Sequence, residues 1–424
     1  MKKSILVKGP ALSRSGYGEQ TRFALRSLRS REDLFDIFLV NIKWGTTGFI
    51  TEDSEERRWL DNLLRKTITH HQAGGQFDVS LQVTIPNEFE KIAPINIGYT
   101  AGIETTKVSP GWVEKAWMMD HLIVVSNHSK DTFEGTKLTA RDSNNNIVAE
   151  DVSTLNPVAG ATATEITTVN YPVRNYKPTE LELNLDTDFN FLTVAQWGPR
   201  KNLKKTVQWF VDEFKQDNVG LVVKANTSKN CVLDKNVTMQ RMKQVLEEHS
   251  DRKCKVYLLH GDMTDEELTG LYSHPSIDAY ATLTHGEGYG LPIFEAAYNG
   301  LPVLAPDWSG QCDFLHMPVK SKNGKVKDKA MFAKVNYELR PIPQEARWKG
   351  VLEDDSKWCY ADRGSYKAKL REMYKDIGRF NSQAKKLQTW LQEEFTEEKK
   401  YKEFVDCITK TCDTEQQQAE VVVL

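Results

Sequence analysis

Residues 285–297, which read HGEGYGLPIFEAA, decide the organisation of this chain of 424 residues. A short apolar run precedes them and a helical pattern follows the glycines, so we predict a strand, a turn and a helix in that order. Pro292 suits the first turn of this helix. Glycines let the backbone approach a ligand closely, and the free N–H groups at a helix start favour a phosphate. The segment therefore predicts an anion-binding turn after a buried strand.

Two carboxylates accompany this turn: Glu287 lies in the predicted loop and Glu295 one turn into the predicted helix. Carboxylates so placed can accept hydrogen bonds from vicinal hydroxyls, one from those of a hexose and the other from those of a ribose. In the alternative interpretation, Glu295 is a solvated helix residue and the glycines only make a turn.

Outward from this segment, short β-rich runs alternate with helical patterns along both halves of the chain. The predicted strands of the first half are residues 4–7, 35–41, 79–83, 95–99 and 122–125, with helices such as 18–29 and 55–64. The second half repeats the order with strands 191–195, 221–223, 256–259, 279–283 and 302–305 and helices 203–215, 265–272 and 292–299. The pattern predicts an α/β protein of two Rossmann-like domains facing a cleft, with ligands beyond the carboxyl ends of the strands.

The predicted domains are residues 1–180, residues 181–385, and a C-terminal helix and tail over 386–424. The linker is placed near 173–188, where prolines and charges interrupt the periodicity. A long charged helix is expected over about 366–411, followed by a frayed end.

Composition excludes several classes of protein. Hydrophobic residues make up 39% of the chain and charged residues 27%, which is typical of a globular protein, and no apolar run approaches the roughly 20 residues that span a bilayer. The net charge of −3 argues against nucleic-acid binding by overall charge, although a local basic patch is compatible with it. The apolar run 4–7 stops at Lys8, which suits a first strand rather than a signal peptide. Six cysteines without C-x-x-C spacing indicate reduced thiols and a cytoplasmic protein.

The quoted segment resembles the retaining glycosyltransferases of family 4, which have the two-domain GT-B fold. Their hallmark is E-x7-E within E-G-[FY]-G-L-P-x-x-E-A, and Glu287 and Glu295 reproduce it. The continuations 299–303 (NGLPV) and 307–310 (DWSG) are similar to the family's next strand and loop. The resemblance implies that Glu287 contacts the donor sugar, that Glu295 contacts the ribose, and that the backbone of Gly288, Tyr289, Gly290 and Leu291 holds the sugar and phosphates.

A second match lies at residues 196–203, QWGPRKNL, which resembles the family segment ending R-K-N-L. The resemblance implies that Lys201 binds the donor diphosphate, with Arg200 as an assistant. A cation there opposes the negative charge that develops when the sugar–phosphate bond breaks. The family usually has an arginine where this chain has Gln196, so Arg200 or Lys224 would supply the second charge. The alternative for Lys201 is a solvated lysine at a helix start.

Further resemblances are shorter. Residues 13–18, SRSGYG, are similar to the family's glycine-rich first loop, so Gly16 and Gly18 are expected beside the donor phosphates and the acceptor. Glu104 follows the fourth strand, where many relatives carry a histidine; it either orients the acceptor hydroxyl or is an ordinary cleft residue. Met263, in the loop after another strand, is expected near the donor base through its backbone.

The function implied is transfer of a hexosyl or pentosyl group from a UDP- or GDP-sugar to an acceptor hydroxyl with retention. No cofactor and no metal are expected, because the pair Asp186 and Asp188, which matches D-x-D, lies in the linker and is interpreted as a turn. The alternatives are a phosphorylase of the same architecture, whose cofactor-binding lysine context is not found, and a sugar-nucleotide-binding module without turnover. Because Gln196 stands where the family usually has an arginine, a binding module without turnover stays an alternative.

The acceptor is left as either a saccharide or a modified DNA. A basic run surrounds the hairpin-like turn Asn323-Gly324, and it is interpreted as solvated surface or as a contact for an anionic acceptor. It comprises Lys320, Lys322, Lys325, Lys327 and Lys329. Together with residues 335–341 and 358–359, it resembles phage glycosyltransferases that modify hydroxymethylated pyrimidines in DNA, which would place the protein in the host cytoplasm. No membrane span is expected, and the oligomeric state is not predicted.

Overall fold

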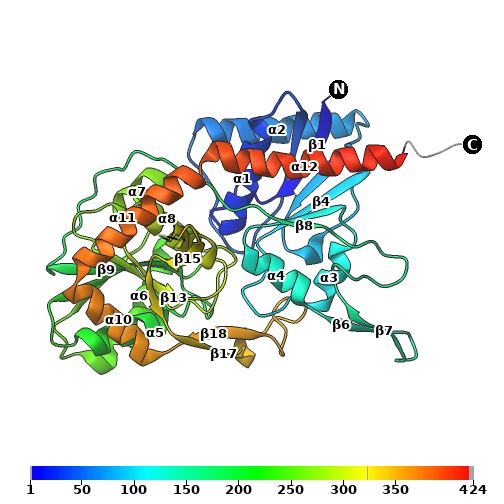
Figure 1. Ribbon diagram of the computed structural model, residues 1–424. Coiled ribbons are helices and arrows are strands. Elements are labelled where there is room, and N and C mark those ends of the chain that lie inside the picture. Colours follow the sequence, from blue (N-terminus) through cyan, green and yellow to red (C-terminus); the bar gives the residue numbers. More distant parts are fainter. Residues whose placement is uncertain (1, 322, 420–424) are drawn as a thin grey trace, which may run out of the picture. The chain divides into compact units, whose positions relative to one another are not determined.

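The computed structural model describes residues 2–321 and 323–419 (Figure 1). Its contacts divide the chain into two compact units. The first unit comprises Met1–Pro172, Arg347–Ser356 and Glu397–Leu424, and the second comprises Val173–Ala346 and Lys357–Thr396. Each unit is built around its own parallel six-stranded sheet.

The sheet of the first unit has the order β2-β1-β3-β4-β5-β8. All its neighbouring strands pair in parallel, and most of their residues are buried because helices cover such a sheet on both faces. The strands are β1 (Lys3–Gly9), β2 (Phe35–Asn41), β3 (Val79–Val83), β4 (Ile95–Thr100), β5 (His121–Val124) and β8 (Ile166–Thr168).

The helices of the first unit follow its strands. They are α1 (Gly16–Arg29), α2 (Glu55–Gln72), α3 (Pro110–Ala116), α4 (Asn127–Gly135) and α12 (Glu397–Ala419), with the short helix η1 (Pro86–Glu88). An antiparallel hairpin, β6 (Leu138–Arg141) and β7 (Ile147–Val152), is inserted before β8. All five strands predicted for this half are present, and α1 and α2 run longer than predicted.

The sheet of the second unit has the order β11-β10-β9-β12-β13-β16, again fully parallel. Numbered within the unit, this is the order 3-2-1-4-5-6 of the dinucleotide-binding fold. The strands are β9 (Phe189–Gln196), β10 (Val219–Asn226), β11 (Lys255–Leu259), β12 (Ala279–Ala281), β13 (Val303–Pro306) and β16 (Ala333–Val335).

Helix α5 (Leu203–Phe214) shows how this unit forms its core. Val207, Phe210 and Phe214 recur at helical spacing and are fully buried against the sheet. Burying a side chain of this size contributes about 1.5–3 kcal/mol. The remaining helices are α6 (Val232–Leu246), η2 (Glu247–His249), α7 (Asp265–Tyr272), α8 (Leu291–Tyr298), α9 (Cys312–Leu315), η3 (Gln344–Ala346), α10 (Arg363–Lys375) and α11 (Ile377–Glu394).

Two antiparallel ribbons complete the second unit. One is β14 (His316–Lys320) with β15 (Val326–Ala330), and the other is β17 (Tyr337–Pro341) with β18 (Lys357–Ala361). The hairpin predicted around Asn323-Gly324 is the turn of the first ribbon, and Gly324 has the left-handed φ of 82° that such turns require.

The prediction of one helix over 366–411 is wrong. The segment forms α10, α11 and α12, which are interrupted at Asp376 and again at Phe395 and Thr396. Asp376 leaves helical geometry, with φ −138° and ψ 49°. The sequence is charged and helical in pattern on both sides of each interruption. Periodicity alone therefore did not predict where one helix ends and the next begins. The helix α12 continues to Ala419, past the residue where fraying was expected; residues 420–424 lie outside the described residues.

The compact units also differ from the domain limits expected from sequence. Their boundary falls between Pro172 and Val173, not at 180, and residues 386–396 stay with the second unit while α12 joins the first. The ring of Phe404 on α12 packs edge-on against Phe23 of α1 at 5.3 Å and lies 5.0 Å from the ring of Tyr99 on β4. This apolar contact assigns α12 to the first unit.

Candidate functional site

The candidate site lies where the strand order of the second sheet reverses. Strands β10 and β12 flank β9, and the chain departs from β9 in opposite directions along the sheet. Ligands of open α/β sheets bind outside the carboxyl ends of the strands at such a switch point. The loops that leave β9 and β12 here are residues 197–202 and 282–290, the two segments singled out from sequence.

These loops bring Glu287, Lys201 and Arg200 into contact. Lys201 Nζ donates to both carboxylate oxygens of Glu287 at 2.7 Å, and Arg200 Nη1 donates to Glu287 Oε2 at 2.9 Å and to the Gly286 carbonyl at 2.7 Å. Glu287 is only 6% exposed. Burial by itself would raise the pKa of this carboxyl, but the charges of Lys201 and Arg200 outweigh it and lower the pKa to about 2. Glu287 is therefore ionised at neutral pH.

The loop that follows β13 fixes the backbone of Glu287. Its N–H donates to Ser309 Oγ at 2.9 Å, and its carbonyl accepts from the N–H of Gly310 at 3.0 Å. A Cβ on Gly310 would lie 2.1 Å from the carbonyl oxygen of Gly288, so the two loops can approach this closely only with glycine at 310. The DWSG resemblance pointed to this loop, but it did not reveal that Ser309 holds Glu287.

His285 ties the candidate site to β18. Its backbone N–H donates to the Arg200 carbonyl at 2.8 Å, its carbonyl accepts from the N–H of Cys359, and its ring Nδ1 bonds the Cys359 carbonyl. The ring stacks on that of buried Trp358 at 5.3 Å. The sequence did not indicate this contact, because β18 is distant along the chain and neither segment carries a local signal of it.

Glu295 lies on α8, and its Oε2 accepts a hydrogen bond from Tyr272 Oη at 3.0 Å. Burial raises the pKa of Tyr280 on β12, and the charges of Glu287 and Glu295 add to this effect. Gly290 begins α8 with a left-handed φ of 99°, and Pro292 lies in the first turn as predicted.

The other predicted residues of this unit lie in neighbouring loops. Lys224, at the end of β10, donates to the Gly261 carbonyl, and burial lowers the pKa of its amine. That contact places it beside the loop after β11, which carries Met263. The side chain of Tyr289 is buried against Phe294 and Phe314, so only its backbone is available to a ligand.

In the first unit, the glycine-rich loop leads into α1. Ser15 caps the helix by accepting the N–H of Gly18 at 3.0 Å. A Cβ on Gly18 would lie 1.9 Å from the Ser13 carbonyl oxygen, whereas a Cβ on Gly16 would meet nothing within 4 Å. Of the two glycines, only Gly18 is required by this loop.

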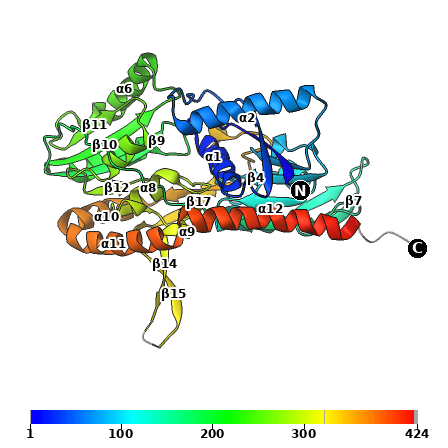
Figure 2. The same ribbon diagram turned by 90° about the horizontal axis from the view of Figure 1, so that it is seen from above.

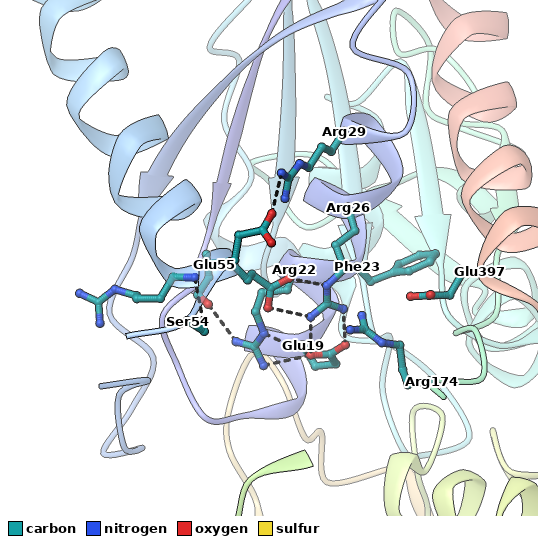
Figure 3. A network of polar contacts seen from close by, with 12 residues as sticks. Glu19, Arg22, Phe23, Arg26, Arg29, Ser54, Glu55, Arg174 and Glu397 are labelled. Atoms are coloured by element: carbon teal, nitrogen blue, oxygen red, sulfur yellow. Dashed lines mark hydrogen bonds and ion pairs between the residues drawn. The ribbon is translucent and has the colours of Figure 1, made fainter. Parts of the chain in front are cut away.

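A network of charged side chains lies along α1, and Figure 3 shows Glu19, Arg22 and Arg26 within it. Arg22 Nη1 donates to the carbonyls of Ala11 at 2.8 Å and Ser13 at 3.0 Å, and its Nε donates to Glu19 at 3.2 Å. Glu19 also accepts from Arg26 at 2.7 Å. Arg22 therefore ties the loop to the helix that follows it.

Glu104 lies in the loop after β4, on the same side of the first sheet. Its charge contributes to raising the pKa of Tyr17, whose hydroxyl contacts Thr100 Oγ1 at 2.9 Å. The ring of His128 bonds the backbone of Ile103 and Thr105, on both sides of Glu104. Burial lowers the pKa of His128 to about 4, so it holds this loop as a neutral ring at pH 7.

Two groups of side chains in the second unit contain acidic residues of the kind that bind metal ions. Asp186 and Asp188 precede β9 and so lie at the amino end of the sheet, away from Glu287; Asp188 accepts from Asn218 at 3.0 Å. Among the described residues, only Asp307, Cys312 and His316 bring three candidate ligand atoms within 4.8 Å of one another. Asp307 there already accepts from His316 at 2.7 Å and pairs with Lys334 at 2.9 Å.

Comparison with known proteins identifies the fold. No protein-family model matches the sequence, and no match is found among curated proteins. Among the solved structures that match nearly the whole chain are the following three. Anabaena HepE, in complex with UDP and glucose, has a TM-score of 0.59 and 13% identity over 96% of this chain and 100% of that one. Sucrose-phosphate synthase from Thermosynechococcus elongatus has a TM-score of 0.59 and 12% identity over 97% and 100%. A glycosyltransferase from Rickettsia africae has a TM-score of 0.57 and 11% identity over 97% and 99%.

At such identities the likeness establishes the fold, which is the GT-B fold of two Rossmann-like units predicted from sequence. None of the described helices is both long enough and apolar enough to cross a membrane.

Proposed function

We propose that this protein is a retaining glycosyltransferase of the family 4 type. It moves a hexosyl or pentosyl group from a UDP- or GDP-sugar to an acceptor hydroxyl, and it needs no metal ion. The observation that carries the proposal is the contact of Lys201 and Arg200 with buried Glu287 at the switch point of a dinucleotide-binding sheet.

The charges of this cluster suit a diphosphate. Two cations share one carboxylate, so the three side chains have a formal charge of +1 before a donor binds. Both cations stay partly exposed, with side-chain exposures of 29% for Arg200 and 19% for Lys201. A cation already in place stabilises the charge that develops on the leaving diphosphate.

Glu287 and Glu295 bind different parts of the donor. Ionised Glu287 accepts hydrogen bonds from the hydroxyls of the donor sugar, and Glu295, on α8, accepts them from the ribose. The family usually has an arginine where this chain has Gln196. Arg200 supplies that second positive charge, because it contacts Glu287 whereas Lys224 donates to the Gly261 carbonyl.

In the reaction, the acceptor oxygen bonds the anomeric carbon on the face from which the diphosphate departs. The bond between that carbon and the phosphate oxygen breaks, and the acceptor proton passes to an oxygen of the leaving diphosphate. The products are the glycosylated acceptor and a nucleoside diphosphate. No side chain acts as a nucleophile, and configuration at the anomeric carbon is retained.

The acceptor is a saccharide or a hydroxymethylated pyrimidine in DNA, the latter if the protein is of the phage type and works in the host cytoplasm. HepE, of the same fold, was crystallised with UDP and glucose and with UDP-glucose, which supports a UDP-sugar as the first donor to test.

A thermal-shift screen against UDP- and GDP-sugars, with and without magnesium, tests this proposal. Binding to the native state alone stabilises it in proportion to the logarithm of ligand excess. We expect one donor to raise the melting temperature equally with and without magnesium. Failure of every donor to do so would contradict the proposal.

Transfer by the Lys201→Ala variant tests the catalytic role. We expect turnover to fall by about 10²–10³-fold, as when one donor of an oxyanion-stabilising site is lost. Lys204→Ala, on the exposed side of α5, is the matched control and should keep full activity. Donor binding by the wild type without turnover on any acceptor would instead favour a binding module, the alternative that Gln196 keeps open.

A further inference from the structure

The ribbon formed by β14 and β15 has no assigned role. Figure 2 shows it running away from the sheet and helices of the second unit. Every described residue from Lys320 to Lys329 is exposed, and Val326 keeps 57% of its surface in solvent. An isolated two-stranded ribbon is marginally stable in water, so a ribbon this exposed contributes little to the core.

The ribbon concentrates positive charge in a chain whose net charge is −3. Residues 316–330 contain five lysines against one acidic residue, Asp328. Lys320, Lys325, Lys327 and Lys329 have no ion pair within the described part of the chain, in contrast to the paired Lys66, Lys107 or Lys215.

The register of the ribbon orders these charges. Lys327 pairs with Val319 and Lys329 with Met317, so both lysines stand on one face. Asp328, paired with Pro318, and Lys320, paired with Val326, stand on the other. Alternate residues of a strand are about 6.6–6.8 Å apart. Two lysines on one face at this spacing present a row of positive charge, which suits a polyanion whose phosphates repeat along each strand.

The base of the ribbon is fixed beside the candidate donor site. His316, its first residue, donates to Asp307 at 2.7 Å, and Gln383 donates to the Ala330 carbonyl at 2.9 Å. Asp307 begins the loop whose Ser309 and Gly310 hold Glu287. A polymer bound along the ribbon is thereby held at a fixed place relative to Glu287.

We propose that the ribbon formed by β14 and β15 binds the phosphate backbone of double-stranded DNA. Its contacts are to phosphates, so the binding is independent of sequence and weakens with salt. The identification of DNA as the acceptor rests on the proposed transferase function, but the binding itself does not.

The test is a titration of a fluorescently labelled duplex of about 30 base pairs by anisotropy, from 50 to 200 mM salt. The ribbon variant carries Lys320→Gln, Lys325→Gln, Lys327→Gln and Lys329→Gln. The control carries Lys235→Gln, Lys243→Gln, Lys385→Gln and Lys386→Gln, exposed lysines of α6 and α11 that remove the same charge. We expect the ribbon variant to lose about 10- to 100-fold in affinity at 100 mM salt. Its log–log salt slope should become shallower by about 3–4, while the control stays near wild type.

Equal losses in the ribbon variant and the control would overturn the proposal, as would a wild type that binds an acidic polysaccharide and not DNA. Lysines also protect exposed strand edges from pairing. If that is their only role, the variant will aggregate while its soluble fraction binds DNA like the wild type, which also overturns the proposal. Donor thermal shifts are measured on the same samples. If no donor shifts the melting temperature of the wild type although it binds DNA, the proposed transferase function is contradicted. The proposal that the ribbon binds DNA is not.

Discussion

Glu287 is the residue in which burial and charge compete most directly. Its carboxylate is buried, which favours the neutral form, yet contacts with Lys201 and Arg200 keep it ionised. The local pattern E-x7-E indicated Glu287 and Glu295, and the R-K-N-L pattern indicated Lys201. Neither pattern showed that the cations and Glu287 meet, because residues 200–201 and 287 are brought together only by the pairing of β9 with β12.

The stability contributed by Glu287 should depend on pH. Its folded pKa of about 2 lies below its ordinary value of 4.5, so its contribution is complete above pH 4.5 and is lost as the pH falls towards 2. The full shift corresponds to about 3 kcal/mol. We expect Glu287→Gln to be less stable than the wild type in urea unfolding at pH 7, and the gap to narrow below pH 4.5. A gap that stays constant from pH 7 to pH 3 would contradict this.

At the scale of elements, function depends on how loops leave their strands. The loop after β1 is closed over α1 so tightly that only glycine fits at position 18, and Arg22 holds its carbonyls. The spacing of Gly16 and Gly18 made them equivalent in sequence. The structure distinguishes them, because the path of the backbone decides which atoms a Cβ at each position would contact.

The two glycines form a matched pair for mutation. Gly18→Ala would place Cβ against the Ser13 carbonyl, so the loop must shift, and we expect a loss of about 1–3 kcal/mol in stability together with weaker transfer. Gly16→Ala enters open space and should leave both nearly unchanged. Denaturant unfolding and steady-state kinetics of the two variants measure the difference. Similar behaviour of both would show that the loop is not closed as described.

At the scale of the whole molecule, the chain leaves the first unit and returns to it twice. After completing the second unit with α11, it continues into α12, which packs in the first. Residues 347–356 likewise join the first unit, where the Gly350 carbonyl accepts from Ser109 Oγ at 2.9 Å and Val351 is buried in a core cluster. The first unit is therefore not complete as a continuous N-terminal segment.

Truncating Phe404 on α12 should destabilise the first unit selectively. Its ring is fully buried against Phe23 and Tyr99, so Phe404→Ala should cost about 3–5 kcal/mol. We expect faster hydrogen exchange in β1, β3 and β4, with protection of β9 and β12 and the donor thermal shift retained. Lys402→Ala, on the exposed side of the same helix, is the control. Equal loss of protection in both sheets would show that the units unfold together.

Local sequence was enough to predict the alternation of strands and helices, the loops that carry Glu287, Lys201 and Gly18, and the basic turn at Asn323-Gly324. Those features depend on local periodicity, turn chemistry and short motifs, all of which can be recognised within a few consecutive residues. Contacts in the folded molecule were needed to show that Ser309 and His285 support the site, that Lys224 donates to the Gly261 carbonyl, and that α12 belongs to the first unit. These depend on which apolar faces and backbone groups meet across long separations, and no local pattern records that choice.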